Sequence, residues 1–336
     1  MEDKQEQTIE KYGFQVKNRY RARGAILLDT EEGPRLMREY EKIQGHFSFA
    51  NEVKELLYDR GMTLTDRVVP NLEGDLVTEW ESGEKYVVYE WYYGENCDYR
   101  SRQGLLKAAE NLGCLHNRLK GTAPEPVPLE EDLIQRYARH NRELKRVYTY
   151  MKEKKRKNEF ELSAICCFPE FYNKAKKVVE QLKQCRYYQV HGSVTRDLCH
   201  GEYNYHNLIF TKKGVATTNF ERTGYGIQWM DLAYFMRKTM EKNGWDVEKG
   251  EAVLEGYRRE KEIQEDDVEF LLLTLTYPVK YWKLMNQYIN GKKSWMSSKN
   301  MEKLIGVREQ EKAKENFIKE IAGNENIHWS FYKIMV

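Results

Sequence analysis

The sequence predicts an α+β protein with a small, β-rich N-terminal lobe and a larger, mostly helical C-terminal lobe. Residues 13–40 alternate apolar and polar side chains between turn signals, which is typical of short strands. From Asp98 onward, apolar residues recur at the three- and four-residue spacing of amphipathic helices. The length of 336 residues exceeds that of one typical domain. We therefore expect two lobes, residues 12–93 and 94–336.

The N-terminal lobe is expected to be a sheet with one helix inserted after its third strand. Turns at Arg21–Gly24 and Glu31–Pro34 divide the first region into three strands. A helix is predicted in "FSFANEVKELLYDRG", which ends at Gly61, because one face of it carries Phe49, Val53, Leu56 and Leu57. Further strands are expected near 65–70, near 75–80 and from Tyr86 to Gly94.

The C-terminal lobe is expected to be helical around one small β-hairpin. A linker, "PEPVPL", occupies 124–129, and the only strands expected flank "TKKG", over Leu208–Phe210 and Val215–Phe220. Helices are expected from Ser101 to Gly121 and at about 129–157, 161–183, 229–242, 248–260, 266–289 and 299–321. A sheet-rich first third joined by one linker to a helical remainder is the order of elements in bilobal protein-kinase-like folds.

The composition argues against several classes of partner. Lys and Arg number 55 against 53 Asp and Glu, so the net charge of +2 favours neither a nucleic-acid partner nor an anionic membrane. No stretch approaches the roughly 20 apolar residues of a spanning helix. The polar first residues contain no signal region, which predicts synthesis in the cytosol. The six cysteines are scattered and are expected to be reduced thiols.

The segment "LCHGEYNYHNLIF", residues 198–210, has the spacing of a phosphotransferase catalytic loop. His200 and Gly201 precede an acid, Glu202, and Asn207 follows five positions later. Kinases use Asp as the base that receives the hydroxyl proton. Glu is one methylene longer, and a displacement of about 1 Å can cost about 10²-fold in rate. Glu202 is thus the candidate base, within a catalytic set of His200, Glu202 and Asn207.

Two asparagines occupy the positions expected of metal ligands. Asn207 is a neutral oxygen ligand, and Asn219 in "TTNFER" stands where these enzymes place an Asp. Mg²⁺ prefers charged oxygens, so this pair predicts weakened binding of ATP and Mg²⁺. The candidate metal ligands are Asn207 and Asn219.

The candidate cofactor-binding residues lie in the N-terminal lobe. Arg38 on the third strand stands where a Lys would hold phosphates, and Arg does not replace Lys conservatively at such a site. Glu52 on the following helix is a candidate ion-pair partner for Arg38, with Glu55 as a rival. Glu90 and Trp91, at the end of the last strand, complete this set.

Two further residues are expected to be structural. Asp231 in "WMDLAYFMRK" opens a helix, where it could cap that helix or accept backbone N–H groups of the catalytic loop. His116 lies on an apolar helix face and is expected to be a hydrogen-bonded core histidine.

Three stretches together resemble one family: "HGEYNYHNLIF", "NFERTGYGIQWMDLAYFMRKTMEKNGW" and "YPVKYW". They are similar to the aminoglycoside phosphotransferase and choline kinase superfamily and, within it, to the spore coat protein S (CotS) family of endospore-forming bacteria. The resemblance runs from about residue 12 to 325. It implies a kinase-like fold with ATP between the lobes, synthesis in the mother-cell cytoplasm, a place in the spore coat and other coat proteins as partners.

Three functions remain open at this stage. The first is a degenerate kinase fold that serves in coat assembly or binding, as the changes at Arg38, Glu202 and Asn219 suggest. The second is an active, atypical ATP-dependent small-molecule or sugar kinase with Glu202 as base. The third is a nucleotide-binding regulator without turnover. Cationic acceptors of the aminoglycoside type require a surplus of Asp and Glu in the substrate groove. The helices after residue 246 carry acidic and basic residues in almost equal number, so the sequence does not show whether the groove has such a surplus.

Overall fold

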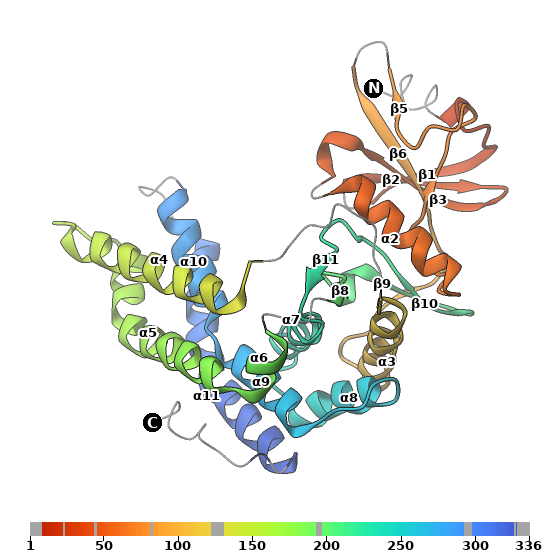
Figure 1. The fold of residues 1–336 in the computed structure, drawn as a ribbon. Coiled ribbons are helices and arrows are strands. Elements are labelled where there is room, and N and C mark those ends of the chain that lie inside the picture. Colours follow the sequence, from red (N-terminus) through yellow and green to blue (C-terminus); the bar gives the residue numbers. More distant parts are fainter. Residues whose placement is uncertain are drawn as a thin grey trace.

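The fold is known from a computed structural model (Figure 1). It describes residues 9–22, 24–43, 46–80, 83–121, 131–192, 197–291, 298–325 and 327. The predicted linker at 124–129 lies outside these residues.

An antiparallel sheet forms most of the N-terminal part, as predicted. The strand order is β1-β2-β3-β6-β4, and β5 also pairs with β6. Its strands are β1 (Val16–Ala22), β2 (Ala25–Thr30), β3 (Gly33–Glu39), β4 (Val68–Val69), β5 (Thr78–Glu79) and β6 (Lys85–Glu90). The strands β4 and β5 are shorter than expected, whereas the first three agree closely with the prediction.

The period-two pattern of β3 and β6 explains why both faces of this sheet are buried. Met37 and Val88 belong to one buried cluster, whereas their neighbours Leu36 and Val87 belong to another. The short 3-10 turn η1 (Tyr40–Lys42) and helix α2 (Phe47–Asp59) follow β3, so the expected inserted helix is confirmed. Its buried face differs from the prediction: Ala50 and Lys54 are also buried, and the predicted Leu56 is only half-buried.

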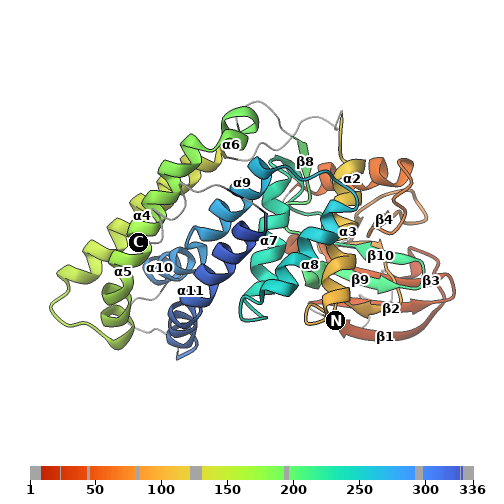
Figure 2. The same cartoon turned by 90° about the horizontal axis from the view of Figure 1, so that it is seen from below.

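Helices form most of the C-terminal part. They are α3 (Arg102–Arg118), α4 (Leu133–Glu153), α5 (Glu159–Gln184), α6 (Arg186–His191), α7 (Trp229–Met240), α8 (Val247–Arg258), α9 (Glu265–Thr276), α10 (Val279–Asn290) and α11 (Ser298–Asn324). The views agree that α4 and α5 lie at the end of the molecule opposite the sheet (Figures 1 and 2). Within the described residues, no helix is long and apolar enough to cross a bilayer.

The single helix predicted over 266–289 is wrong, because the structure has two helices there, α9 and α10. They are separated at Tyr277 and Pro278, and Tyr277 has the extended ψ of 131°. Proline lacks an N–H and disfavours the helical conformation of the residue before it. The apolar periodicity continues across this break, so it gave no sign of the bend that places α10 beside α4.

The predicted hairpin around "TKKG" is confirmed as β9 (Leu208–Thr211) paired with β10 (Gly214–Thr217). The expectation that it holds the only strands of this half is wrong. The structure adds three very short strands: β7 (Glu95–Asn96), β8 (Asp197–Cys199) and β11 (Gly224–Gly226). Strands of two or three residues have no periodic pattern, and they form because β7 pairs with β9 and β11 with β8.

The close packing of α3 against α8 depends on Gly256, and it generates a testable prediction. A Cβ at Gly256 would lie 2.2 Å from the backbone oxygen of Leu106. We expect Gly256→Ala to lower the free energy of unfolding by about 1–3 kcal/mol through overpacking, measured by urea denaturation.

Gly306→Ala on α11 is the matched control, because a Cβ there meets nothing within 4 Å. It should raise stability by up to about 1 kcal/mol through helix propensity. Equal effects of the two substitutions would contradict the role given to Gly256.

Candidate functional site

Asp231 on α7 holds the predicted catalytic loop through backbone hydrogen bonds. Its Oδ2 accepts from the N–H of His200 at 2.7 Å, and its Oδ1 from that of Gly201 at 2.9 Å. This confirms one of the two roles expected for Asp231. The loop turns tightly here, because Gly201 has a φ of 77° and a Cβ on it would lie 2.0 Å from the carbonyl oxygen of Arg222.

A buried chain of hydrogen bonds supports Asp231 from behind. His116 Nε2 lies 3.3 Å from Asp231 Oδ2, and His116 Nδ1 lies 2.8 Å from the hydroxyl of Tyr257. Since the carboxylate only accepts, Nε2 carries the hydrogen and Nδ1 accepts from Tyr257. Burial lowers the pKa of His116, which keeps it neutral. The expected core histidine is confirmed.

His200 positions the loop and is fully buried. Its Nε2 lies 3.1 Å from the carbonyl oxygen of Thr218 and donates to it, while Nδ1 accepts from the N–H of Glu202 at 3.2 Å. Its ring packs against Phe220 at 4.6 Å between centroids. Burial lowers the pKa of His200, so a neutral imidazole ties the loop to the end of β10.

The candidate base Glu202 reaches the surface of this loop. Its side chain is 33% exposed, and its Oε2 lies 3.5 Å from Nε of Arg222. Its backbone oxygen accepts from the side-chain amides of Asn204 at 2.9 Å and Asn207 at 3.0 Å. Since the amide nitrogen of Asn207 is used to shape the loop, Oδ1 is the atom with which Asn207 could contact a cation.

Asn219 follows β10 in the left-handed conformation, with a φ of 66°. Asn and Asp tolerate this region better than other non-glycine residues, so the position suits the Asp that kinases have there. Its backbone N–H donates to Oδ2 of Asp66 at 2.8 Å. The structure thus brings a carboxylate from before β4 to the backbone of Asn219.

Lys54 and Asp66 form a buried pair that sequence reasoning missed. Lys54 Nζ donates to the backbone oxygen of Asp66 at 2.6 Å and lies 3.7 Å from its Oδ1. It also lies 4.7 Å from the ring centroid of Tyr89 on β6. Burial lowers the pKa of Lys54, and Asp66 opposes that shift. The feature of the sequence that could have revealed this pair is the position of Lys54 among the apolar residues on the buried face of α2.

Arg38 pairs with Glu221, the second residue after Asn219, and does not pair with Glu52. The expected ion pair between Arg38 and Glu52 is therefore wrong: Glu52 is exposed and accepts a hydrogen bond from Ser48 at 3.2 Å. Protein kinases have glycine at the position of Glu221. The carboxylate at this position was therefore visible in the sequence as a departure from the kinase pattern. Glu55, the other candidate partner, binds Arg67 at 2.7 Å.

Glu90 is the last residue of β6 and Trp91 follows it, so the strand ends earlier than the predicted Gly94. The backbone N–H groups of both residues donate hydrogen bonds. The N–H of Glu90 donates to the carbonyl of Arg67 at 2.8 Å, and that of Trp91 donates to the carbonyl of Pro34 at 3.2 Å. The next residue fixes the same segment, since the hydroxyl of Tyr92 donates to the carbonyl of Thr65 at 2.6 Å. This segment is therefore held rigidly against the sheet.

The described residues differ from the usual Mg²⁺–ATP site of a kinase in the charges at several positions. Asn207 and Asn219 are neutral, and the carboxylate of Asp66 lies 3.7 Å from Nζ of Lys54. Glu221 pairs with Arg38, the candidate for the positive charge that phosphates require. No group of three or more His, Cys, Asp or Glu residues in the described part of the chain could hold a metal ion.

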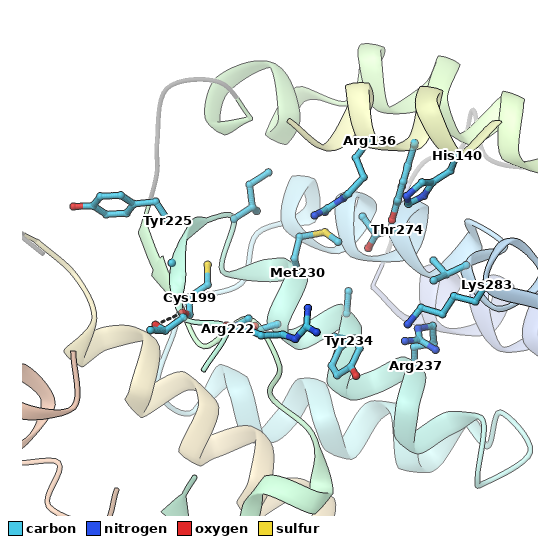
Figure 3. A pocket seen from close by; sticks show the side chains of 18 of the residues that line it. Arg136, His140, Cys199, Arg222, Tyr225, Met230, Tyr234, Arg237, Thr274 and Lys283 are labelled. Atoms are coloured by element: carbon cyan, nitrogen blue, oxygen red, sulfur yellow. Dashed lines mark hydrogen bonds between the residues drawn. The ribbon is translucent and has the colours of Figure 1, made fainter. Parts of the chain in front are cut away.

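A pocket of about 780 Å³ opens beside the catalytic loop. It lies between α4, α7, α10 and the segment that follows Glu221 (Figure 3). Gly201, Glu221 and Asp231 belong to its lining, so a molecule bound there would lie next to the loop. Sequence reasoning missed this pocket, because its walls come from parts of the chain that are far apart in the sequence.

The family model described as "Spore coat putative kinase YutH" matches residues 5–321. No curated protein matches the sequence. The expected resemblance to a CotS-like spore coat family is confirmed by this match, which covers nearly the whole chain.

Solved structures of phosphotransferases share the fold. An aminoglycoside phosphotransferase from Alicyclobacillus acidocaldarius is 15% identical, with a TM-score of 0.79 and 95% of each chain covered. Spectinomycin phosphotransferase APH(9)-Ia, with ADP and spectinomycin, is 12% identical, with a TM-score of 0.64 over 94% of this chain and 98% of that one. Choline kinase LicA from Streptococcus pneumoniae is 15% identical, with a TM-score of 0.54 over 93% and 99%. At these identities, the likeness shows a shared aminoglycoside phosphotransferase and choline kinase fold.

Replacing Asp231 with Asn tests its role as the anchor of the loop. One of the two backbone N–H groups would face an amide N–H₂ and lose its acceptor. We expect the free energy of unfolding to fall by about 2 kcal/mol, measured by urea denaturation. The control Asp246→Asn, at the N-cap of α8, should change it little because Asn caps as well as Asp. Similar small effects at both positions would argue against the anchor.

The buried His140 predicts a loss of stability in mild acid. Burial, followed by the charge of Arg139, lowers its pKa to about 4, below the unfolded value of about 6.5. The unfolded chain therefore binds the extra proton, and stability falls as the pH drops below about 6.5. Between pH 7 and pH 5 this single group should cost about 2 kcal/mol.

His140→Phe isolates that contribution. Phenylalanine can keep the stacking on Trp282, whose centroid is 3.5 Å away, and the Nδ1 that it removes has no hydrogen-bond partner. Urea denaturation at pH 7 and pH 5 should show a smaller loss in the variant than in the wild type. An equal loss in both proteins would refute the assignment.

Proposed function

Because the chain belongs to the spore coat YutH family, we propose that it is a spore-coat-associated protein whose degenerate kinase fold acts in coat assembly or binding. In this proposal its capacity for phosphoryl transfer is lost or greatly weakened. Its partners are other coat proteins, and ATP and Mg²⁺ bind weakly or not at all.

The observation that carries the proposal is the ion pair between Arg38 and Glu221. Phosphoryl transfer depends on positive charge held at the phosphates. Arg38 is the candidate for that charge, and the chain's own carboxylate neutralises it. The same carboxylate repels a nucleotide phosphate from this position. Asn219, without a charge, supplies no compensating attraction for a metal ion.

The second candidate function is an active, atypical ATP-dependent kinase of small molecules or sugars with Glu202 as base. It is favoured by the intact anchoring of the loop by Asp231 and by the partial exposure of the Glu202 side chain. Robust Mg²⁺-dependent phosphorylation of a hydroxyl acceptor, abolished by Asn207→Ala, would establish this function and remove the first.

Glu221→Gln is expected to strengthen nucleotide binding, because it releases Arg38 and removes a negative charge. A hydrogen bond from a released Arg to a phosphate is worth about 1.5–3 kcal/mol, which corresponds to at least about tenfold in Kd. The measurement is a thermal-shift titration with ATP and ADP, with and without Mg²⁺ or Mn²⁺. A ligand at 100 times its Kd stabilises a fold by about 2.7 kcal/mol.

The matched control is Glu52→Gln, which removes the same charge from an exposed position on α2 that is not paired with Arg38. It should leave the titration unchanged. If the wild type already binds ATP with Mg²⁺ as tightly as Glu221→Gln does, the ion pair does not block the site and the proposal fails.

A further inference from the structure

The lining of the pocket beside the catalytic loop is rich in positive charge. Two acids, Glu221 and Asp231, belong to the described lining. Its Arg and Lys residues outnumber them and are Arg136, Arg139, Arg222, Arg237 and Lys283. They come from α4, from the segment after β10, from α7 and from α10. Figure 3 shows Arg136 extending from α4 toward the pocket, with Arg237 and Lys283 close together on another side.

Both acids of the lining are already used by the protein. Asp231 accepts the backbone N–H groups of His200 and Gly201, and Glu221 pairs with Arg38, which does not line the pocket. They therefore offer a cationic ligand little attraction. The side chains that line the pocket thus carry more positive than negative charge.

The acids that pair with the lining arginines lie outside the lining. Arg139 contacts Glu131 and Glu143, at 2.7 and 3.1 Å. Arg237 contacts Glu241 at 2.8 Å. These ion pairs fix the guanidinium groups of Arg139 and Arg237 at the edge of the pocket. Fixed guanidinium groups suit phosphate and carboxylate groups, which they bind through paired hydrogen bonds.

Lys283 shows the surplus of positive charge most clearly. Burial lowers its pKa, and Arg237 and Lys238 lower it further, whereas Glu241 and Glu202 oppose the shift. Within the described part of the chain, no ion pair is formed by its Nζ. A bound anion would relieve this repulsion, because an opposite charge nearby favours the ammonium form.

Aromatic side chains form the remaining wall at the α4 side. His140 stacks on Trp282 at 3.5 Å between centroids, and both line the pocket. Tyr137 stacks on Tyr277 at 3.7 Å beside them. Such flat surfaces accept a ring or a hydrocarbon portion of a ligand. The volume of about 780 Å³ lies in the range of pockets that hold small organic molecules.

We propose that this pocket binds a small organic anion that carries two or more phosphate or carboxylate groups. This inference rests on the proposed binding function and names the class of ligand for it. A cationic acceptor of the aminoglycoside type requires a surplus of Asp and Glu, and the described lining has the opposite balance. The anionic groups would contact Arg136, Arg237 and Lys283, and the organic part would lie against His140 and Trp282.

Isothermal titration calorimetry with three probes tests the charge preference at low ionic strength. Pyrophosphate and citrate represent the phosphate and carboxylate sources, and spermidine represents cations. We expect at least one anion to bind, binding to weaken in high salt because charges are screened, and spermidine to give no heat of binding. Tighter binding of spermidine than of both anions, or no binding of either anion at millimolar concentration, overturns the proposal.

The double variant Arg136→Gln with Lys283→Gln locates the site. Each lost charge-assisted hydrogen bond should weaken anion binding by about tenfold or more. Arg146→Gln is the matched control, because this arginine is exposed on α4 and does not line the pocket. If the double variant binds the anion as tightly as the wild type, or if only Arg38→Gln removes binding, the anion binds elsewhere and the proposal is overturned. Lys283→Gln alone serves if the double variant does not fold.

The outcome is separable from that of the proposed function. Phosphoryl transfer from ATP is measured in the same wild-type preparation without added anion. If the wild type transfers phosphate and the double variant loses pyrophosphate binding, the proposal of an impaired kinase fails and the proposal of an anion pocket stands. If the wild type neither transfers phosphate nor binds the anions, the proposal of an impaired kinase stands and the proposal of an anion pocket fails.

Discussion

The carboxylate of Asp231 is the interaction on which the arrangement of the site depends. It accepts the backbone N–H groups of His200 and Gly201, and His116 and Tyr257 connect it to α3 and α8. Asp231, His200, His116 and Tyr257 are buried, where an unpaired polar group is costly. These bonds hold the start of the loop that carries Glu202 and Asn207 in place. The same carboxylate closes one side of the neighbouring pocket.

This rigid framework is combined with an altered set of charges. Kinase catalysis requires cations at the phosphates and carboxylates at the metal. Here Arg38 pairs with Glu221, and the buried Lys54 pairs with Asp66. Positive charge that faces a pocket is found instead around α4, α7 and α10.

The predictions from the sequence were accurate where an element depends on local interactions, and less accurate where it depends on residues far apart in the chain. The first three strands and the β9–β10 hairpin were predicted well because their alternation and turns are local. Pro278 was visible in the sequence, yet the continuous apolar periodicity suggested one helix across it. Pro169, by contrast, lies inside α5, so proline alone does not decide where a helix ends. The very short β8 and β11 had no local signal, because each exists only as the partner of the other.

The sequence by itself determined the class of fold, the family and the spacing of His200, Glu202 and Asn207, because these follow from residue periodicity and from short contiguous motifs. Only the tertiary structure decided which charges meet. Arg38 and Glu221 are 183 positions apart, and Asp66 and Asn219 are 153 apart. The sequence offered Glu52 and Glu55 as nearer partners for Arg38. The choice among them depends on which side chains the folded sheet and α2 direct into the same space, and local sequence carries no information about that.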